Sequence, residues 1–258
     1  MKRKIKTWTM RIAATGFISM CSIVAALFNP GVLYANETIV GNFTIRHHQK
    51  LDDAMTDRLV AIDKMVKESE LYDPSFRVEL CLNDGSYYPE LIKTLRGVAF
   101  GWGFSDKAIF YGEANFKTNR VHLNGYEWNL EQLFVHEITH CLQHHHFGWL
   151  GSNPLARHPE WKWEGYAEYA SRKGPNQRSL LQNMERMNLA KAEKPNAWGI
   201  LFDDSTVAPR IYYQHWMLMQ YCLDITGMTY EEVIDSSLTK EGLQKEVEDW
   251  YLHQKQSL

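Results

Sequence analysis

The segment Leu130–Gly148 (LEQLFVHEITHCLQHHHFG) constrains this chain more than any other part of the sequence. It contains the pattern H-E-x-x-H, formed by His136, Glu137 and His140. Residues four apart on an α-helix lie on one face, so both imidazoles can point at a single metal ion with the carboxylate beside them. Apolar residues at helical spacing predict a buried opposite face: Leu130, Leu133, Phe134, Ile138 and Leu142. A packed helix would hold both imidazoles rigidly.

A catalytic zinc ion needs a third protein ligand, and the first candidate is Glu164. It lies in a predicted second helix at 160–172, about 24 residues after the motif. Glu168 follows one turn later on the same face, where it could accept the second ring N–H of a ligating histidine. The alternative is a solvated acidic face that also includes Glu160. The preceding H-E-x-x-H motif favours the ligand interpretation.

The second candidate for the third ligand is His146, six residues after His140. The chain reads H-E-x-x-H-x-x-Q-x-x-H, whereas the metzincin pattern has glycine in place of Gln143. Glycine there lets the chain leave the helix with a positive φ, so glutamine predicts that the helix continues and turns His146 away. His144 stays on the ligand face, but we interpret the run from His144 to His146 as a solvated helix end.

Residues 1–35 predict an export signal, with a basic start, an apolar run at Ile12–Phe28 and a small residue, Ala35, for cleavage. An uncleaved N-terminal anchor is the alternative, and it would be the only contact with a membrane. Either way, residues 36–258 are expected as one domain outside the cytoplasm, secreted or extracytoplasmic.

Composition and cysteine usage limit the functions and bonds that this domain can have. A net charge of −3 gives no basic field for nucleic acid. Cys21 lies in the export signal, and Cys141 should be a packed core thiol because it points about 100° away from His140 on the helix. A pair between Cys81 and Cys222 is left open.

The order of predicted elements indicates the fold class. Short strands and one amphipathic helix precede the motif, with a further short helix at 88–95, and helices dominate after it. The predicted strands are 42–48, 76–82, 97–104, 108–111 and 119–124, and the predicted helices are 51–71, 88–95, 130–148, 160–172, 180–191, 211–225, 230–237 and 240–254, with a loop at 198–209. This segregation predicts an α+β fold, with a small mixed sheet in the N-terminal half, a helical C-terminal half and the zinc site between them.

HEITH followed by W-x-x-E-G-Y-A-E-Y (Trp161–Tyr169) resembles the gluzincin zinc metallopeptidases, the clan of thermolysin and aminopeptidase N. The likeness is closest to the small exported "peptidase MA-like" family and covers residues 42 to 227. The segments Gly112–Ala114, Pro159–Trp161 and Tyr212–Gln214 follow that family's order. A spacer longer than that of thermolysin and a histidine at 215, where the family has a small residue, are departures.

The resemblance implies a zincin-like fold and assigns roles to particular residues. His136, His140 and Glu164 would bind zinc, and Glu137 would be the general base. Glu168 would support a ligand histidine. An oxyanion donor is expected in the helix at 211–225, with Tyr212 first and Tyr213 or His215 as alternatives; core aromatic residues are the competing interpretation.

The resemblance also implies a zinc-dependent hydrolase whose partner is a peptide or protein substrate. The strand at 119–124 is expected to be the free edge that pairs with an extended peptide. Ala114 stands where aminopeptidase N-type enzymes carry a glutamate for the substrate's amino terminus, which favours an endopeptidase. The alternatives are a non-catalytic zinc-binding module, disfavoured by the intact Glu137, and a hydrolase of a non-protein amide on the same scaffold.

Overall fold

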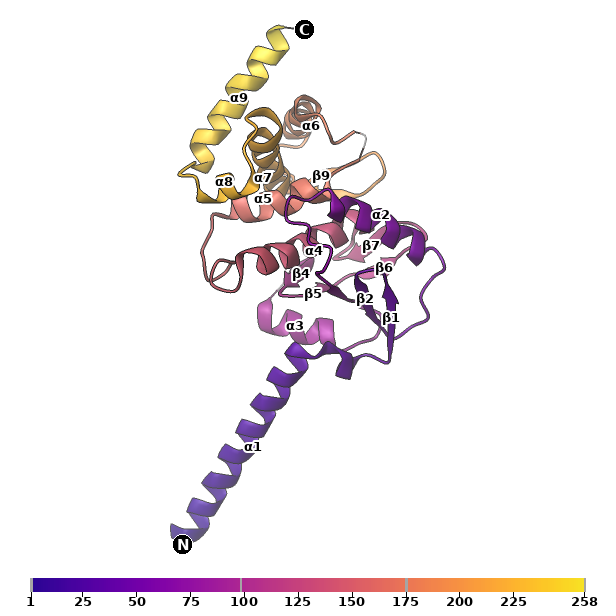
Figure 1. Cartoon of the computed structure of the whole chain (residues 1–258), viewed down its shortest axis with the longest axis vertical. Coiled ribbons are helices and arrows are strands. Elements are labelled where there is room, and N and C mark those ends of the chain that lie inside the picture. Colours follow the sequence, from indigo (N-terminus) through magenta and orange to yellow (C-terminus); the bar gives the residue numbers. More distant parts are fainter. Residues whose placement is uncertain (1, 98, 175, 258) are drawn as a thin grey trace.

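A computed structural model describes residues 2–97, 99–174 and 176–257, and for residues 2–13 only the course of the helix (Figure 1). The chain has an α+β fold, with a mixed sheet in the N-terminal half and a mostly helical C-terminal half. The fold class predicted from the sequence is therefore confirmed.

The N-terminal helix α1 (Lys2–Phe28) projects away from the rest of the chain in Figure 1. It joins the domain through the short 3₁₀ turn Pro30–Leu33, and the hydroxyl of Tyr88 donates a hydrogen bond of 2.9 Å to the carbonyl of Leu27. In the part of the chain that the structure describes, no helix has both the length and the apolar composition needed to cross a bilayer. The export signal at 1–35 stays a prediction.

The main sheet has five strands in the order β1 (Asn36–Val40), β2 (Phe43–His47), β3 (Val78–Cys81), β5 (Lys107–Phe110) and β4 (Gly101–Phe104). The pairs β2–β3 and β3–β5 are parallel, and the outer pairs β1–β2 and β4–β5 are antiparallel. Helix α2 (Met55–Lys67) connects β2 to β3, and α3 (Tyr88–Arg96) precedes β4. β4 is thus an edge strand of this sheet.

A smaller antiparallel sheet contains β6 (Glu113–Asn115), β7 (Arg120–Leu123) and β8 (Tyr126–Asn129) in that order. The prediction that 119–124 is a free edge strand is wrong, because β7 lies in the middle and is paired on both sides. The reason is the two-residue turn Asn124-Gly125, in which both residues have positive φ and fold β8 back onto β7.

The helical half starts with the motif helix α4 (Leu130–Phe147). Asn129 caps its first turn by accepting from the backbone N–H of Gln132, and Gly148 ends it with a φ of 68°. The helices that follow are α5 (Glu160–Ser171), α6 (Leu180–Glu193), α7 (Arg210–Gln220) with a π-helical turn at Tyr221–Ile225, α8 (Tyr230–Asp235) and α9 (Lys240–Gln256). The loop predicted at 198–209 is instead a hairpin of β9 (Gly199–Leu201) and β10 (Val207–Pro209).

Helix α4 lies between the two halves of the fold (Figure 1). One side packs on the main sheet, where the rings of Phe134 and Phe110 stack with their centroids 3.7 Å apart. The other side packs on α5, and α5 packs in turn on α7. Cys141 is fully buried and free, which confirms a core thiol, and Cys81 and Cys222 are buried without a disulfide between them. The motif is therefore held at the centre of the molecule.

Candidate metal centre

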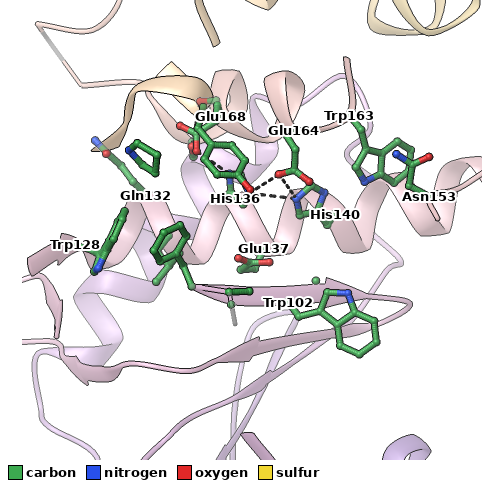
Figure 2. Close-up of a pocket in the computed structure, with 18 of the residues that line it drawn as sticks. Trp102, Trp128, Gln132, His136, Glu137, His140, Asn153, Trp163, Glu164 and Glu168 are labelled. Atoms are coloured by element: carbon green, nitrogen blue, oxygen red, sulfur yellow. Dashed lines mark hydrogen bonds and ion pairs between the residues drawn. The ribbon is translucent and has the colours of Figure 1, made fainter. Parts of the chain in front are cut away.

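Helices α4 and α5 bring His136, His140 and Glu164 together (Figure 2). The two Nε2 atoms lie 3.1 Å apart, and Oε2 of Glu164 lies 3.2 Å from each. A tetrahedral zinc ion with bonds of about 2.0–2.2 Å separates its ligand atoms by roughly 3.3–3.6 Å. The observed separations are slightly shorter than this range, so small shifts of the three side chains would admit one zinc ion. Among the described residues, no other His, Cys, Asp or Glu joins this cluster.

Of the three histidines expected to form a solvated helix end, His145 and His146 are exposed as predicted and His144 is not. His146 does turn away from the cluster, and its Nε2 contacts Glu231. His145 is exposed and contacts Asp73. His144 contradicts the expectation, because it is buried in the cavity wall under the rings of Phe104 and Trp163. Burial, followed by the nearby His140, lowers the pKa of His144 to about 4, so this side chain is neutral at pH 7.

His136 is supported by charged side chains. Oε1 of Glu168 lies 3.2 Å from its Nδ1, off the direction of a full hydrogen bond. The other oxygen of Glu168 accepts from Nε of Arg172, whose Nη1 donates to Gln132 at 3.1 Å. Burial alone would raise the pKa of Glu168, but Arg172 and His136 outweigh it and hold that pKa at about 2. The carboxylate therefore stays ionised behind the imidazole.

His140 is supported by a neutral side chain, Gln143. Its Oε1 lies 2.7 Å from Nδ1 of His140. Its amide nitrogen donates to the carbonyl of Trp163 at 3.0 Å and to the hydroxyl of Tyr230 at 2.6 Å. Because both amide hydrogens are used, the oxygen must accept from Nδ1–H, which leaves the lone pair of Nε2 for a metal ion. Sequence reasoning missed this role, although the spacing of three residues from His140 was a usable signal.

Glu137 lies beside the cluster without joining it, and only 4% of its surface is exposed. Burial raises its pKa, and a hydrogen bond from the backbone N–H of Gly103 opposes that rise. Strand β4 approaches this side chain so closely that a Cβ at Gly101 would lie 2.7 Å from Oε1 of Glu137. A Cβ at Gly103 would lie 2.1 Å from the backbone oxygen of Glu137. Both glycines are needed for strand and helix to meet at this distance.

The edge strand at the site is β4, and not the segment Gly112–Ala114 that the resemblance indicated. Gly112–Ala114 leads into β6, which lies in the smaller sheet and does not line the cavity. Ala114 therefore lies on a strand away from the cavity, and it does not correspond to the glutamate that holds the substrate's amino terminus in aminopeptidase N-type enzymes. β4 reads Gly-Trp-Gly-Phe and carries no carboxylate that could hold a substrate's amino terminus.

A cavity of about 670 Å³ opens over the cluster. Its walls come from β4, α4, α5 and the start of α7, and Glu137 lies at its centre in Figure 2. One end carries Phe100 and Trp128, whose ring centroids lie 4.1 Å apart. The other end carries Trp102 and Asn153 (Figure 2). A side chain or a short extended segment of a substrate fits a space of this size.

Of the three candidate oxyanion donors, Tyr212 alone lines the cavity. Its ring centroid lies 6.2 Å from that of His136. Burial and then the charge of Glu164 raise its pKa, so the hydroxyl keeps its proton. Tyr213 is fully buried and accepts from Arg186 at 3.0 Å, and His215 lies 3.0 Å from Nζ of Lys240.

The small residue Gly165 explains how Tyr212 comes near the cluster. A Cβ at this position would lie 2.8 Å from the backbone oxygen of His215. The absence of a side chain at Gly165 therefore permits the close approach of α5 to α7. The approach brings the start of α7, which carries Tyr212, to the cavity.

No protein-family model matches this chain, and no curated protein matches it. The likeness to gluzincins therefore rests on the sequence motifs alone. The arrangement of His136, His140 and Glu164 is a separate observation.

Proposed function

We propose that this protein is a zinc-dependent metallopeptidase of the gluzincin type, acting outside the cytoplasm as the predicted export signal indicates. The observation that carries the proposal is the position of the Glu164 carboxylate, 3.2 Å from both motif imidazoles. Glu137 supports a catalytic role rather than a purely structural one, because a structural zinc site is usually closed by a fourth protein ligand. Here the carboxylate of Glu137 does not join the ligand cluster and instead lines the cavity.

Zinc bound by His136, His140 and Glu164 would acidify a water molecule and polarise the substrate carbonyl. Glu137 would take the proton at its carboxylate and return it to the leaving amine, a role that a pKa raised by burial suits. The protonated hydroxyl of Tyr212 would donate a hydrogen bond to the developing oxyanion. Gln143 and Glu168 would keep the two imidazoles in the orientation that binds metal.

The path proposed for a substrate follows β4. This strand pairs with β5 on one side only, so its other side is available for the backbone of an extended peptide. The cavity continues past Glu137 toward both Trp128 and Trp102 (Figure 2). Space on both sides of the general base, with no carboxylate on β4, supports an endopeptidase over an aminopeptidase.

The proposal is tested by measuring zinc content and hydrolysis on the same preparation of the full chain. We expect one zinc per chain and cleavage of a mixed peptide library, followed by mass spectrometry. Glu137→Gln should keep the zinc and lose at least about 100-fold in kcat/KM, since it removes the base alone. Glu164→Gln should lose both zinc and activity, whereas Glu160→Gln, an exposed position on the same helix, should lose neither.

Zinc binding without cleavage of any peptide would contradict the proposal. Cleavage of a non-peptide amide in that case would assign the same scaffold to another hydrolase class. If neither substrate class were cut, a zinc-binding module without catalysis would be the conclusion.

A further inference from the structure

Two arginines in the cavity wall, Arg96 and Arg157, differ from the other arginines with described side chains. Both are exposed at the cavity, and in the described part of the chain neither donates a hydrogen bond nor forms an ion pair. The remaining arginines each contact a protein oxygen: Arg46, Arg58, Arg77, Arg120, Arg172, Arg178, Arg186 and Arg210. Both residues with unpartnered guanidinium groups thus line the cavity of the candidate metal centre.

Arg96 lies at the end of α3, with its guanidinium carbon 5.5 Å from the ring centroid of Trp102. Trp102 is on β4, between the two glycines that contact the motif helix. A guanidinium over an aromatic ring is oriented by that contact, and its N–H edge stays available for an acceptor. Arg96 is therefore an oriented donor group without an acceptor.

Arg157 lies in the loop between α4 and α5 and has a φ of 56°, a conformation that residues other than glycine rarely adopt. The side chain of Asn153 closes this loop, accepting from the N–H of His158 at 2.7 Å and donating to its carbonyl at 3.1 Å. The ring of His158 stacks on Trp163 with centroids 5.6 Å apart. Strained residues held by their surroundings are concentrated at functional sites.

Each arginine has a neighbour at the same end of the cavity: Arg96 lies over the ring of Trp102, and Arg157 lies in the loop that Asn153 closes. Figure 2 shows Trp102 and Asn153 on the His140 side of Glu137, and Trp128 and Gln132 on the opposite side. The opposite end does contain Arg172, but its charge is compensated by Glu168. Uncompensated positive charge therefore lies at the His140 end, and an aromatic pair lies at the other.

We infer that the His140 end of the cavity binds an anionic group of the substrate, either an acidic side chain near the scissile bond or the terminal carboxylate of a peptide. The inference rests on the proposed function and adds a substrate class to it. A planar guanidinium binds a carboxylate through two parallel N–H···O bonds, which gives specificity as well as affinity. Arg96 and Arg157 would be the specificity-determining residues.

The test compares peptides that differ by one charge, using the zinc-loaded full chain. Each pair carries Glu or Gln at one position, scanned along both sides of the scissile bond, and a further pair has a free or amidated C-terminus. We expect kcat/KM about tenfold higher for the acidic member, and at positions on one side of the bond only. A preference that follows the free C-terminus would identify the terminal carboxylate as the anion, and an internal preference an acidic side chain.

Substitutions connect this preference to the two side chains. Arg96→Gln and Arg157→Gln should each reduce the Glu-to-Gln ratio by about threefold, and the double variant should bring it to about one. Cleavage of neutral peptides is the reference in each variant, and the ratio is the quantity compared. Arg77→Gln removes the same charge from an exposed arginine that contacts only the carbonyl of Gly41, and it should leave the ratio unchanged.

Binding measurements separate this inference from the proposed function. The same peptide pairs are titrated into zinc-loaded Glu137→Gln and followed by fluorescence anisotropy. If no peptide is hydrolysed, the proposed function fails, while tighter binding of the acidic member still supports the anion site. Equal affinity for both members, or a preference that survives in the Arg96→Gln/Arg157→Gln double variant, would overturn the inference.

Discussion

The two imidazoles of the candidate metal centre lie one helical turn apart, yet different chemistry supports each of them. Behind His136 is a charged pair, Glu168 and Arg172, extended by Gln132. Behind His140 is a neutral amide, Gln143, connected to Trp163 and to Tyr230 on α8. Both arrangements can orient a ring.

The two supports make different contributions to the site. A carboxylate behind an imidazole increases its basicity and depends on pH, whereas an amide fixes the tautomer without adding charge. The charged support also depends on a second buried ion, because Glu168 and Arg172 are both buried. Removing one member of a buried pair costs more than removing a neutral hydrogen bond.

The largest effect is expected from Glu168→Gln, which leaves Arg172 buried without its counterion. We expect the free energy of unfolding of the metal-free protein to fall by about 3–5 kcal/mol, and zinc affinity to fall about 10–100-fold. Urea unfolding and competition with a zinc chelator measure the two quantities. The double variant Glu168→Gln/Arg172→Gln should recover part of the stability, and no recovery would show that charge pairing is not the cause.

The charged support should also give the metal-free protein an acid-dependent stability. The pKa of Glu168, about 2 in the folded state against 4.5 ordinarily, is depressed. Its contribution is therefore complete above pH 4.5 and is lost as pH falls toward 2, amounting to roughly 2–3 kcal/mol. Urea titrations between these pH values should show this slope in wild type and in Gln143→Ala, and a much smaller one in Glu168→Gln. An unchanged slope in Glu168→Gln would assign the acid dependence to other groups.

The neutral support is expected to give a smaller change. Gln143→Ala removes the hydrogen bond to His140 and leaves the hydroxyl of Tyr230 and the carbonyl of Trp163 without their donor. We expect a loss of about 1–3 kcal/mol in stability and about tenfold in zinc affinity. Ser152→Ala, a buried position that bonds only backbone carbonyls near the end of α4, is the control and should keep zinc affinity. Zinc affinity equal to wild type in Gln143→Ala would remove Gln143 from the site.

The sequence predicted those parts of the site that depend on local spacing. His136, Glu137 and His140 lie on one helix, so the period of that helix alone determines their arrangement. Glu164 and Glu168 were proposed from the spacing within a predicted second helix and then from the resemblance, and the structure places both near the motif. The order of strands before the motif and helices after it was sufficient for the fold class.

The parts that were missed depend on contacts between distant segments. Gln143 acquires its role through Tyr230, which lies 87 residues later. Gly101 and Gly103 act through their closeness to α4, which no pattern along β4 reports. The turn Asn124-Gly125 was an available hairpin signal, and using it would have placed β7 inside its sheet. Whether an arginine has a hydrogen-bond or ion-pair partner can be decided only from the folded structure, because those partners come from distant segments.

Anomalous diffraction at the zinc edge, from crystals of the zinc-loaded full chain, would locate the metal ion itself. We expect a single anomalous peak about 2.0–2.2 Å from Nε2 of His136, Nε2 of His140 and a carboxylate oxygen of Glu164. No peak at this position, or a zinc ion bound instead by the histidines at the end of α4, would contradict this expectation.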